Sequence, residues 1–167
     1  MPSSLLADAF GHHVWATLRV LDSCASLDSE QLATAVPGTY GTIIATLRHL
    51  VGGDVFYLDV LTGREPEPFD EAGSDIPMLR AVMEAQGPAW QRLVAGDIDA
   101  TTDVIEHESN GYETHAPLGI RVAQALHHGT DHRSQVCTAL TNLGIEPPAI
   151  DAWDFGALDG RVLTRRT

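Results

Sequence analysis

Apolar residues recur at helical spacing in four long stretches of the chain, residues 4–25, 43–63, 76–95 and 118–143. In the first stretch, one residue in every three or four is apolar or small, which is the period of an α-helix with one buried face. That stripe consists of Leu6, Phe10, Val14, Thr17 and Leu21. Four helices of this length, joined by loops, predict an all-α four-helix bundle.

Glycine and proline mark the boundaries of these stretches. Pro37-Gly38 precedes the second helix, and Gly144 with Pro147-Pro148 ends the fourth. The polar segment 64–73 is predicted to be a loop. Gly87-Pro88 lies within the third helix and predicts a kink or a break there, because proline cannot donate the backbone hydrogen bond.

Two shorter elements complete the predicted fold. Residues 101–117 contain Asn110-Gly111, a pair typical of a tight β-turn in which both positions have positive φ, so we expect a short β-hairpin. The segment 151–158 is expected to hold a short C-terminal helix that packs onto the bundle through Trp153 and Phe155. The length of 167 residues and the 44% hydrophobic content fit one domain, residues 1–167.

Charge restricts the possible partners and reactions. The net charge is −13, which disfavours binding to nucleic acid or to an anionic membrane surface. All ten basic residues are arginine, so a Schiff-base lysine, a P-loop lysine and a lysine general base are excluded. We therefore expect a small-molecule substrate.

Several features favour a cytoplasmic location. No apolar stretch approaches the roughly 18 residues that span a bilayer, and the N-terminus has no signal-peptide pattern. Cys24 and Cys137 form no CxxC motif, and both fall in predicted helices. We expect them to be buried apolar residues in a reducing compartment.

Three histidines are the strongest chemical signal in the sequence. His128 and His132 lie four residues apart in one predicted helix, so their imidazoles lie on one face, about 6 Å apart along the axis. His49 lies in another predicted helix and could complete a three-histidine metal site with open positions, as catalytic metals require. His127 points about 100° away from His128, and we expect it to face solvent.

Gly52-Gly53 follows His49 within one helical turn. Two glycines inside a helix cost roughly 1 kcal/mol each relative to alanine, so a packing or functional reason is expected. Small residues here would leave room for an ion, a water or a substrate beside His49. A close crossing of two helices would also explain them.

The sequence resembles the DinB family. The segment His128-Gly-Thr-Asp-His-Arg-Ser-Gln135 is similar to the closing motif of that family, and residues 39–51 resemble its first metal-ligand helix. Val14-Trp-Ala16, the predicted hairpin and Trp153-Asp-Phe155 also match the family layout. The resemblance implies a DinB-type four-helix bundle with a short hairpin before the last long helix.

The same resemblance implies a divalent metal held by His49, His128 and His132. Two positions depart from the family pattern: Asp131 stands where a further histidine is common, and Gly53, followed by Asp54, stands where an acid is common. Zinc or nickel is the leading expectation, and imidazole also suits iron and copper. The resemblance further implies a homodimer.

Some DinB-like proteins are transferases or isomerases that use a low-molecular-weight thiol such as mycothiol or bacillithiol. The mycothiol-dependent isomerases tend to carry a further C-terminal region, which disfavours that activity for this sequence. An open site suits either a thiol S-transferase or a hydrolase, because a divalent ion lowers the pKa of a bound thiol or water. The alternative is a non-catalytic metal-binding or stress-response protein with a structural metal.

Several polar residues are expected to support the predicted site. Hydrolysis would need a general base, for which Asp131, Asp54 and Glu113 are candidates. Arg133 and Gln135 are expected to orient a ligand or touch the substrate, or else to form ordinary pairs on the helix surface.

Overall fold

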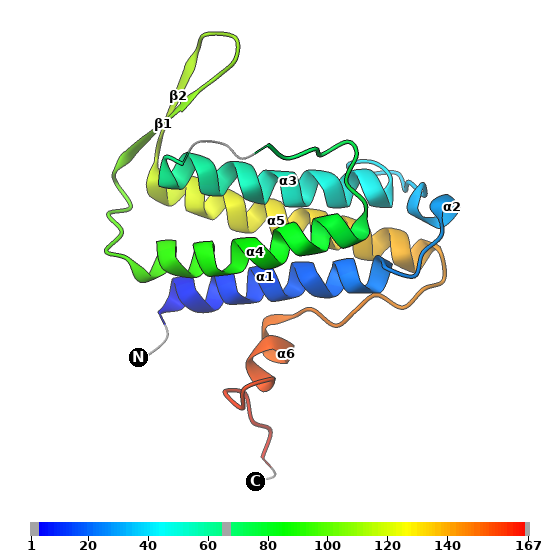
Figure 1. The fold of residues 1–167 in the computed structure, drawn as a ribbon. Helices are drawn as coiled ribbons and strands as arrows, with labels where there is room; N and C mark the ends of the chain where they lie inside the picture. Colours follow the sequence, from blue (N-terminus) through cyan, green and yellow to red (C-terminus); the bar gives the residue numbers. More distant parts are fainter. Residues whose placement is uncertain (1–3, 65–67, 166–167) are drawn as a thin grey trace.

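The computed structural model describes residues 4–64 and 68–165, and in them the chain is mostly helical (Figure 1). Six helices and one two-stranded antiparallel hairpin follow one another along these residues. They are α1 (Leu5–Cys24), α2 (Ser29–Leu32), α3 (Ile43–Thr62), α4 (Ile76–Ala95), β1 (Asp103–His107), β2 (Glu113–Pro117), α5 (Leu118–Asn142) and α6 (Ala152–Ala157).

The bounds of the four long helices confirm the prediction to within one or two residues, because local capping fixes them. The hydroxyl of Ser4 accepts a hydrogen bond from the backbone N–H of Ala7 at the start of α1. Thr42 caps α3 in the same way, and Gly63 ends that helix in the left-handed conformation, with φ of 63°.

Three details differ from the sequence-based expectations. Of the kink or break expected at Gly87-Pro88, the break does not occur, because the helix α4 continues through Pro88. The hairpin turn is a longer loop than a two-residue turn: the N–H of Gly111 bonds to Glu108 O, and only Gly111 has positive φ, not Asn110. The short helix α2 was not predicted; Asp28 and Gln31 cap each other at its start.

The predicted loop 64–73 has its middle, residues 65–67, outside the described residues. Its described part approaches α3, because Phe69 and Glu71 lie against Gly52. No helix in the described part of the chain is long and apolar enough to cross a membrane.

The four long helices lie side by side (Figure 1), with α1 against α4 and α3 against α5, and with further contacts between α3 and α4 and between α1 and α5. The hairpin extends from the end where α5 begins (Figure 1). The buried guanidinium of Arg121 joins it to α5, donating to the carbonyl oxygens of Val104 and Thr114 and to Glu106.

The core consists of two apolar clusters with a buried polar layer between them. Along α1, Phe10 belongs to one cluster and Val20 to the other, and the buried His13 and Thr17 lie between. The same order occurs on α3, where the buried Asp54 separates the two clusters. On α5 the intervening positions are Gly129, His132 and Arg133. The candidate metal ligands lie at the level of this polar layer.

Candidate metal centre

The structure brings His49 of α3 together with His128 and His132 of α5. One imidazole nitrogen of each lies within 4.8 Å of the others, and no other His, Cys, Asp or Glu of the described residues belongs to this group. The Nε2 atoms of His49 and His128 are 3.2 Å apart. Two ligands of a tetrahedral zinc ion with bonds of about 2.1 Å would be separated by about 3.4 Å, so this pair of donors fits a divalent ion.

Gln135 fixes the tautomer of His132. Its side-chain oxygen accepts a hydrogen bond from the backbone N–H of Tyr40, at 2.9 Å, and lies 3.0 Å from His132 Nδ1. Because this oxygen accepts, Nδ1 of His132 carries the proton and Nε2 keeps a lone pair for a metal. A partner of this kind holds a metal-binding imidazole in its productive orientation.

Replacing Gln135 with alanine should therefore weaken metal binding without abolishing it. The expected loss is about 10- to 100-fold in affinity, the usual effect of removing a group that orients a ligand. Isothermal titration with zinc measures this effect. Thr138→Ala on the exposed face of the same helix is the control, and equal affinities for the two variants would contradict the assignment.

His49 is held between an aromatic ring and a carboxylate. The ring of Tyr40 stacks on it, with centroids 4.1 Å apart and planes 5° from parallel. On its other nitrogen, Nδ1 lies 3.8 Å from a carboxylate oxygen of Glu71. The side chain of His49 keeps 32% of its surface exposed, so the cluster lies between α3 and α5 at a position that solvent reaches.

Gly53 makes room for the His128 ring. A Cβ atom at position 53 would lie 2.4 Å from Cε1 of His128, closer than any real contact. The space beside Gly53 is thus filled by the imidazole itself, and the Phe69–Glu71 segment fills the space beside Gly52. The two glycines therefore let the His128 ring and the Phe69–Glu71 segment approach the backbone of α3 closely. They do not leave the space for an ion, a water or a substrate that was one of the two expectations.

Burial keeps two of the three imidazoles neutral. Desolvation lowers the pKa of His128 from 6.5 to about 4, with the neighbouring His132 and His49 adding to the effect. Desolvation and His132 also lower the pKa of His49, against a raising influence of Glu71. At neutral pH both side chains therefore present lone pairs, as a metal ligand must.

The depressed pKa of His128 makes the stability of the metal-free protein depend on pH. In the unfolded chain this group titrates near 6.5, and in the folded protein near 4. Between those pH values the unfolded chain binds more protons than the folded protein does. The contribution of neutral His128 to the free energy of unfolding is therefore complete above pH 6.5 and is lost as the pH drops toward 4.

Thermal unfolding of chelator-treated protein over this pH range measures the effect. The melting temperature should fall with decreasing pH, and the fall should be smaller in His128→Gln. An identical pH dependence in the two proteins would show that His128 does not titrate in this way.

Asp54 lies in the buried layer, and its hydrogen bonds go to side chains of α1 and α4. Its side chain is almost fully buried and accepts hydrogen bonds from Trp90 Nε1, at 2.9 Å, and His13 Nε2, at 2.6 Å. A carboxylate that already accepts hydrogen bonds from two buried donors is poorly suited to act as a general base. The hydrogen bonds of Asp54 place it within the core, and its role in orienting a metal ligand or touching the substrate stays a prediction.

Arg133 completes this buried network and faces α1. Its Nη1 donates to His13 Nδ1, at 3.1 Å, and to Thr17 Oγ1, at 3.1 Å. Since arginine cannot accept, His13 Nδ1 carries no proton, and the ring is neutral and donates from Nε2 to Asp54. Burial lowers the pKa of Arg133 to about 10, so it remains charged at neutral pH. It does not touch the histidine cluster.

The remaining predicted positions also lie away from the cluster. Asp131 and His127 are exposed on α5. Glu113 lies on the hairpin, where it pairs with His107 and His115. Sequence reasoning missed Tyr40, Glu71 and the buried His13, because their partners are remote in the chain. Tyr40 lies in the segment that resembles the first metal-ligand helix, which was the one available signal for it.

Comparison with known proteins agrees with this geometry. The family model of the DinB family matches residues 1–161. The chain belongs to the DinB family. A search of the curated proteins found no match. In this DinB protein the residues that resemble the family motif, His49, His128 and His132, are the three that the fold brings together.

Proposed function

We propose that this DinB protein binds one divalent ion through His49, His128 and His132 and uses the open coordination positions for catalysis. The observation that carries the proposal is the cluster itself: three imidazoles, one with its tautomer fixed by Gln135, with no further protein ligand in the group among the described residues. Zinc and nickel are the favoured ions. A closed structural site would instead have four protein ligands.

We further propose that the reaction is the transfer of a low-molecular-weight thiol to an electrophile. A divalent ion in the cluster would lower the pKa of a thiol and supply a nucleophile at neutral pH. Hydrolysis would also need a general base. The carboxylates expected in that role are engaged or placed elsewhere: Asp54 in the core, Glu113 in the hairpin and Asp131 on the surface. Glu71, beside His49, is then the candidate base, so its replacement separates the two reactions.

The chain's own residues would bind and orient the reactants. Tyr40, 54% exposed, covers one face of His49, and the ring of Tyr57 packs edge-on against His128. Glu71 places a carboxylate oxygen 3.8 Å from His49 Nδ1, where it favours the orientation of that imidazole. If water is the nucleophile instead, Glu71 is the group able to take its proton.

Assays of zinc-loaded and nickel-loaded protein test the proposal. Each is incubated with an electrophile such as monobromobimane and with cysteine, glutathione, mycothiol or bacillithiol. We expect turnover that requires both the metal and a thiol, that is lost in His132→Ala, and that persists in Glu71→Gln. Turnover without a thiol that is lost in Glu71→Gln would indicate a hydrolase, and turnover in metal-free His132→Ala would contradict the proposal.

A non-catalytic metal-binding or stress-response role is the second candidate. The cluster joins α3 to α5, so a bound ion would also link two long helices. In that case the metal would raise the melting temperature strongly, and no thiol and electrophile pair would react.

The fold and assembly expected from the family are part of the proposal. The lengthwise packing of α1, α3, α4 and α5 supports a DinB-type four-helix bundle in a single domain. We expect a homodimer and a cytoplasmic location. Light scattering on the eluate of a gel-filtration column measures the mass in solution.

A further inference from the structure

We propose that a cavity between α1, α5 and α6 binds a small carboxylic acid with an apolar body. This site is separate from the candidate metal centre and does not depend on the proposed function. The cavity lies beside Arg133, whose guanidinium contacts α1. The neighbouring His132 instead faces His49 of α3.

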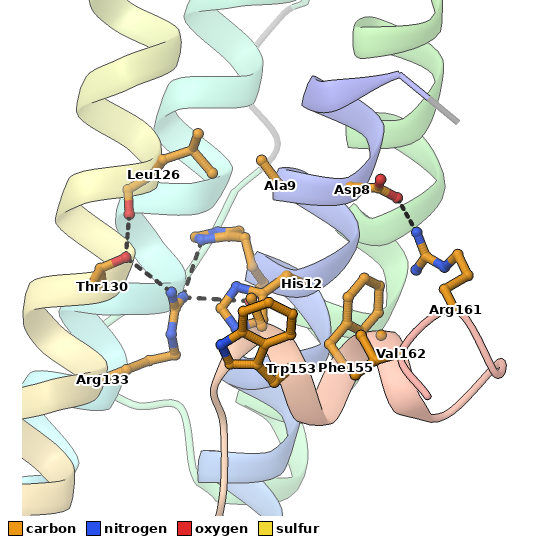
Figure 2. A pocket seen from close by; sticks show the side chains of 13 residues that line it. Asp8, Ala9, His12, Leu126, Thr130, Arg133, Trp153, Phe155, Arg161 and Val162 are labelled. Carbon is orange, nitrogen blue, oxygen red and sulfur yellow. Dashed lines mark hydrogen bonds and ion pairs between the residues drawn. The ribbon is translucent and has the colours of Figure 1, made fainter. Parts of the chain in front are cut away.

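The cavity is largely apolar and has a volume of about 510 Å³, within the range of roughly 300–1,000 Å³ for small-molecule sites. Figure 2 shows it between α1 and α5, with Trp153 and Phe155 of α6 in front. The other apolar side chains that line it include Ala9, Leu126 and Val162. An apolar or aromatic body of a ligand would therefore lie against these rings and aliphatic groups.

The walls of the cavity are held in place by the segment that follows α5. The carbonyl oxygen of Ile150 accepts a hydrogen bond from His12 Nε2, at 2.7 Å. The ring of Phe155 packs against Gly11, where a Cβ atom would lie 3.0 Å from it. At the far end, Arg161 pairs with Asp8 (Figure 2), which neutralises both charges there.

Arg133 supplies the polar recognition at the other end. Its side chain is almost fully buried, yet it lines the cavity together with Thr130. Its Nη1 donates to His13 and Thr17 of α1. One hydrogen of Nη2 bonds to the Thr130 hydroxyl, at 3.2 Å. Nε and the second Nη2 hydrogen have no acceptor among residues 4–64 and 68–165.

A carboxylate suits these two donors. The Nε and Nη2 hydrogens of a guanidinium point in parallel and match the two oxygens of a carboxylate. Such charged hydrogen bonds are strong where water is largely excluded. The apolar cavity adjoining this edge selects a carboxylic acid with a hydrocarbon or aryl body over a small polar anion.

Isothermal titration with octanoate, with octanol as the uncharged counterpart, tests the site. We expect octanoate to bind about tenfold or more tightly than octanol, because only the acid engages Arg133. Binding should be equal in zinc-loaded and chelator-treated protein. Equal affinity for acid and alcohol would overturn the proposal, and so would binding that disappears with the metal, since the acid would then be a metal ligand.

Two variants locate the ligand. Ala9→Leu fills the cavity without touching the buried network and should abolish octanoate binding, whereas Ala95→Leu at the exposed end of α4 should leave it unchanged. Arg133→Lys keeps the charge but lacks the paired donors, and should weaken octanoate binding about tenfold, with circular dichroism confirming the fold. Unchanged binding in Ala9→Leu would place the ligand elsewhere and overturn the assignment.

Discussion

Replacing Gly53 with alanine should remove most of the metal affinity of the protein while leaving α3 helical. The new Cβ would lie 2.4 Å from the His128 ring, so the ring must leave its position in the cluster. Alanine itself favours the helix by about 1 kcal/mol over glycine, which offsets part of the strain. We expect an affinity loss of roughly 100-fold or more, because a ligand is displaced and not only its supporting partner.

Zinc titration of the wild type, Gly53→Ala and Gly87→Ala measures this loss. Gly87 lies in α4, where a Cβ atom would meet only Val14, at 3.3 Å, so the same substitution there should leave metal binding unchanged. Gly53→Ala with wild-type affinity would show that His128 does not bind the ion from its observed position.

The second large effect is expected at Asp54. Asp54→Asn replaces a buried carboxylate that accepts hydrogen bonds from His13 and Trp90. His13 in turn accepts from the guanidinium of Arg133, so the ring links the two opposite charges. Breaking a buried charged network by removing one partner typically costs about 3–5 kcal/mol. For a chain of this size the melting temperature should fall by roughly 10 °C.

Asp22→Asn is the matched control for this experiment. Asp22 lies on α1 and pairs with Arg80, and the two side chains are 52% and 40% exposed. A pair so open to solvent contributes about 1 kcal/mol or less. Thermal unfolding should therefore separate the two variants clearly, and equal shifts would show that the buried network does not stabilise the core.

The sequence was sufficient to predict the helices and the candidate ligands. The apolar period and the capping residues depend on neighbours a few positions away, so the bounds of α1, α3, α4 and α5 could be read locally. The spacing of His128 and His132 placed both rings on one face for the same reason. His49 was connected to them by its place in another helix of the bundle, by the neighbouring glycines and by the family motif, and not by spacing.

The surroundings of the candidate site could not be predicted, because they depend on how remote segments pack. His13 meets Asp54 across 41 positions of the chain, and Arg133 meets His13 across 120. From the sequence, Asp54 was a candidate for an acidic group near the metal ligand His49. In the structure its carboxylate accepts hydrogen bonds from His13 and Trp90 in the core. Gln135 lies beside His132, but its contact with the backbone of Tyr40 had no signal in the sequence.

Local conformations also depended on context. Asn110-Gly111 predicted a turn with two positive φ angles, but a three-residue loop needs only one, which Gly111 supplies. Pro88 lies within α4 without ending it, because the helix is packed against α1 and α3 along its length.

Metal content is the most direct test of the three-histidine centre. Wild-type protein is loaded with zinc or nickel, dialysed and analysed for metal beside His128→Ala and His127→Ala; His127 is the exposed neighbour of His128. The account predicts about one ion per chain in the wild type and in His127→Ala, and almost none in His128→Ala. Equal metal content in His128→Ala and the wild type would contradict it.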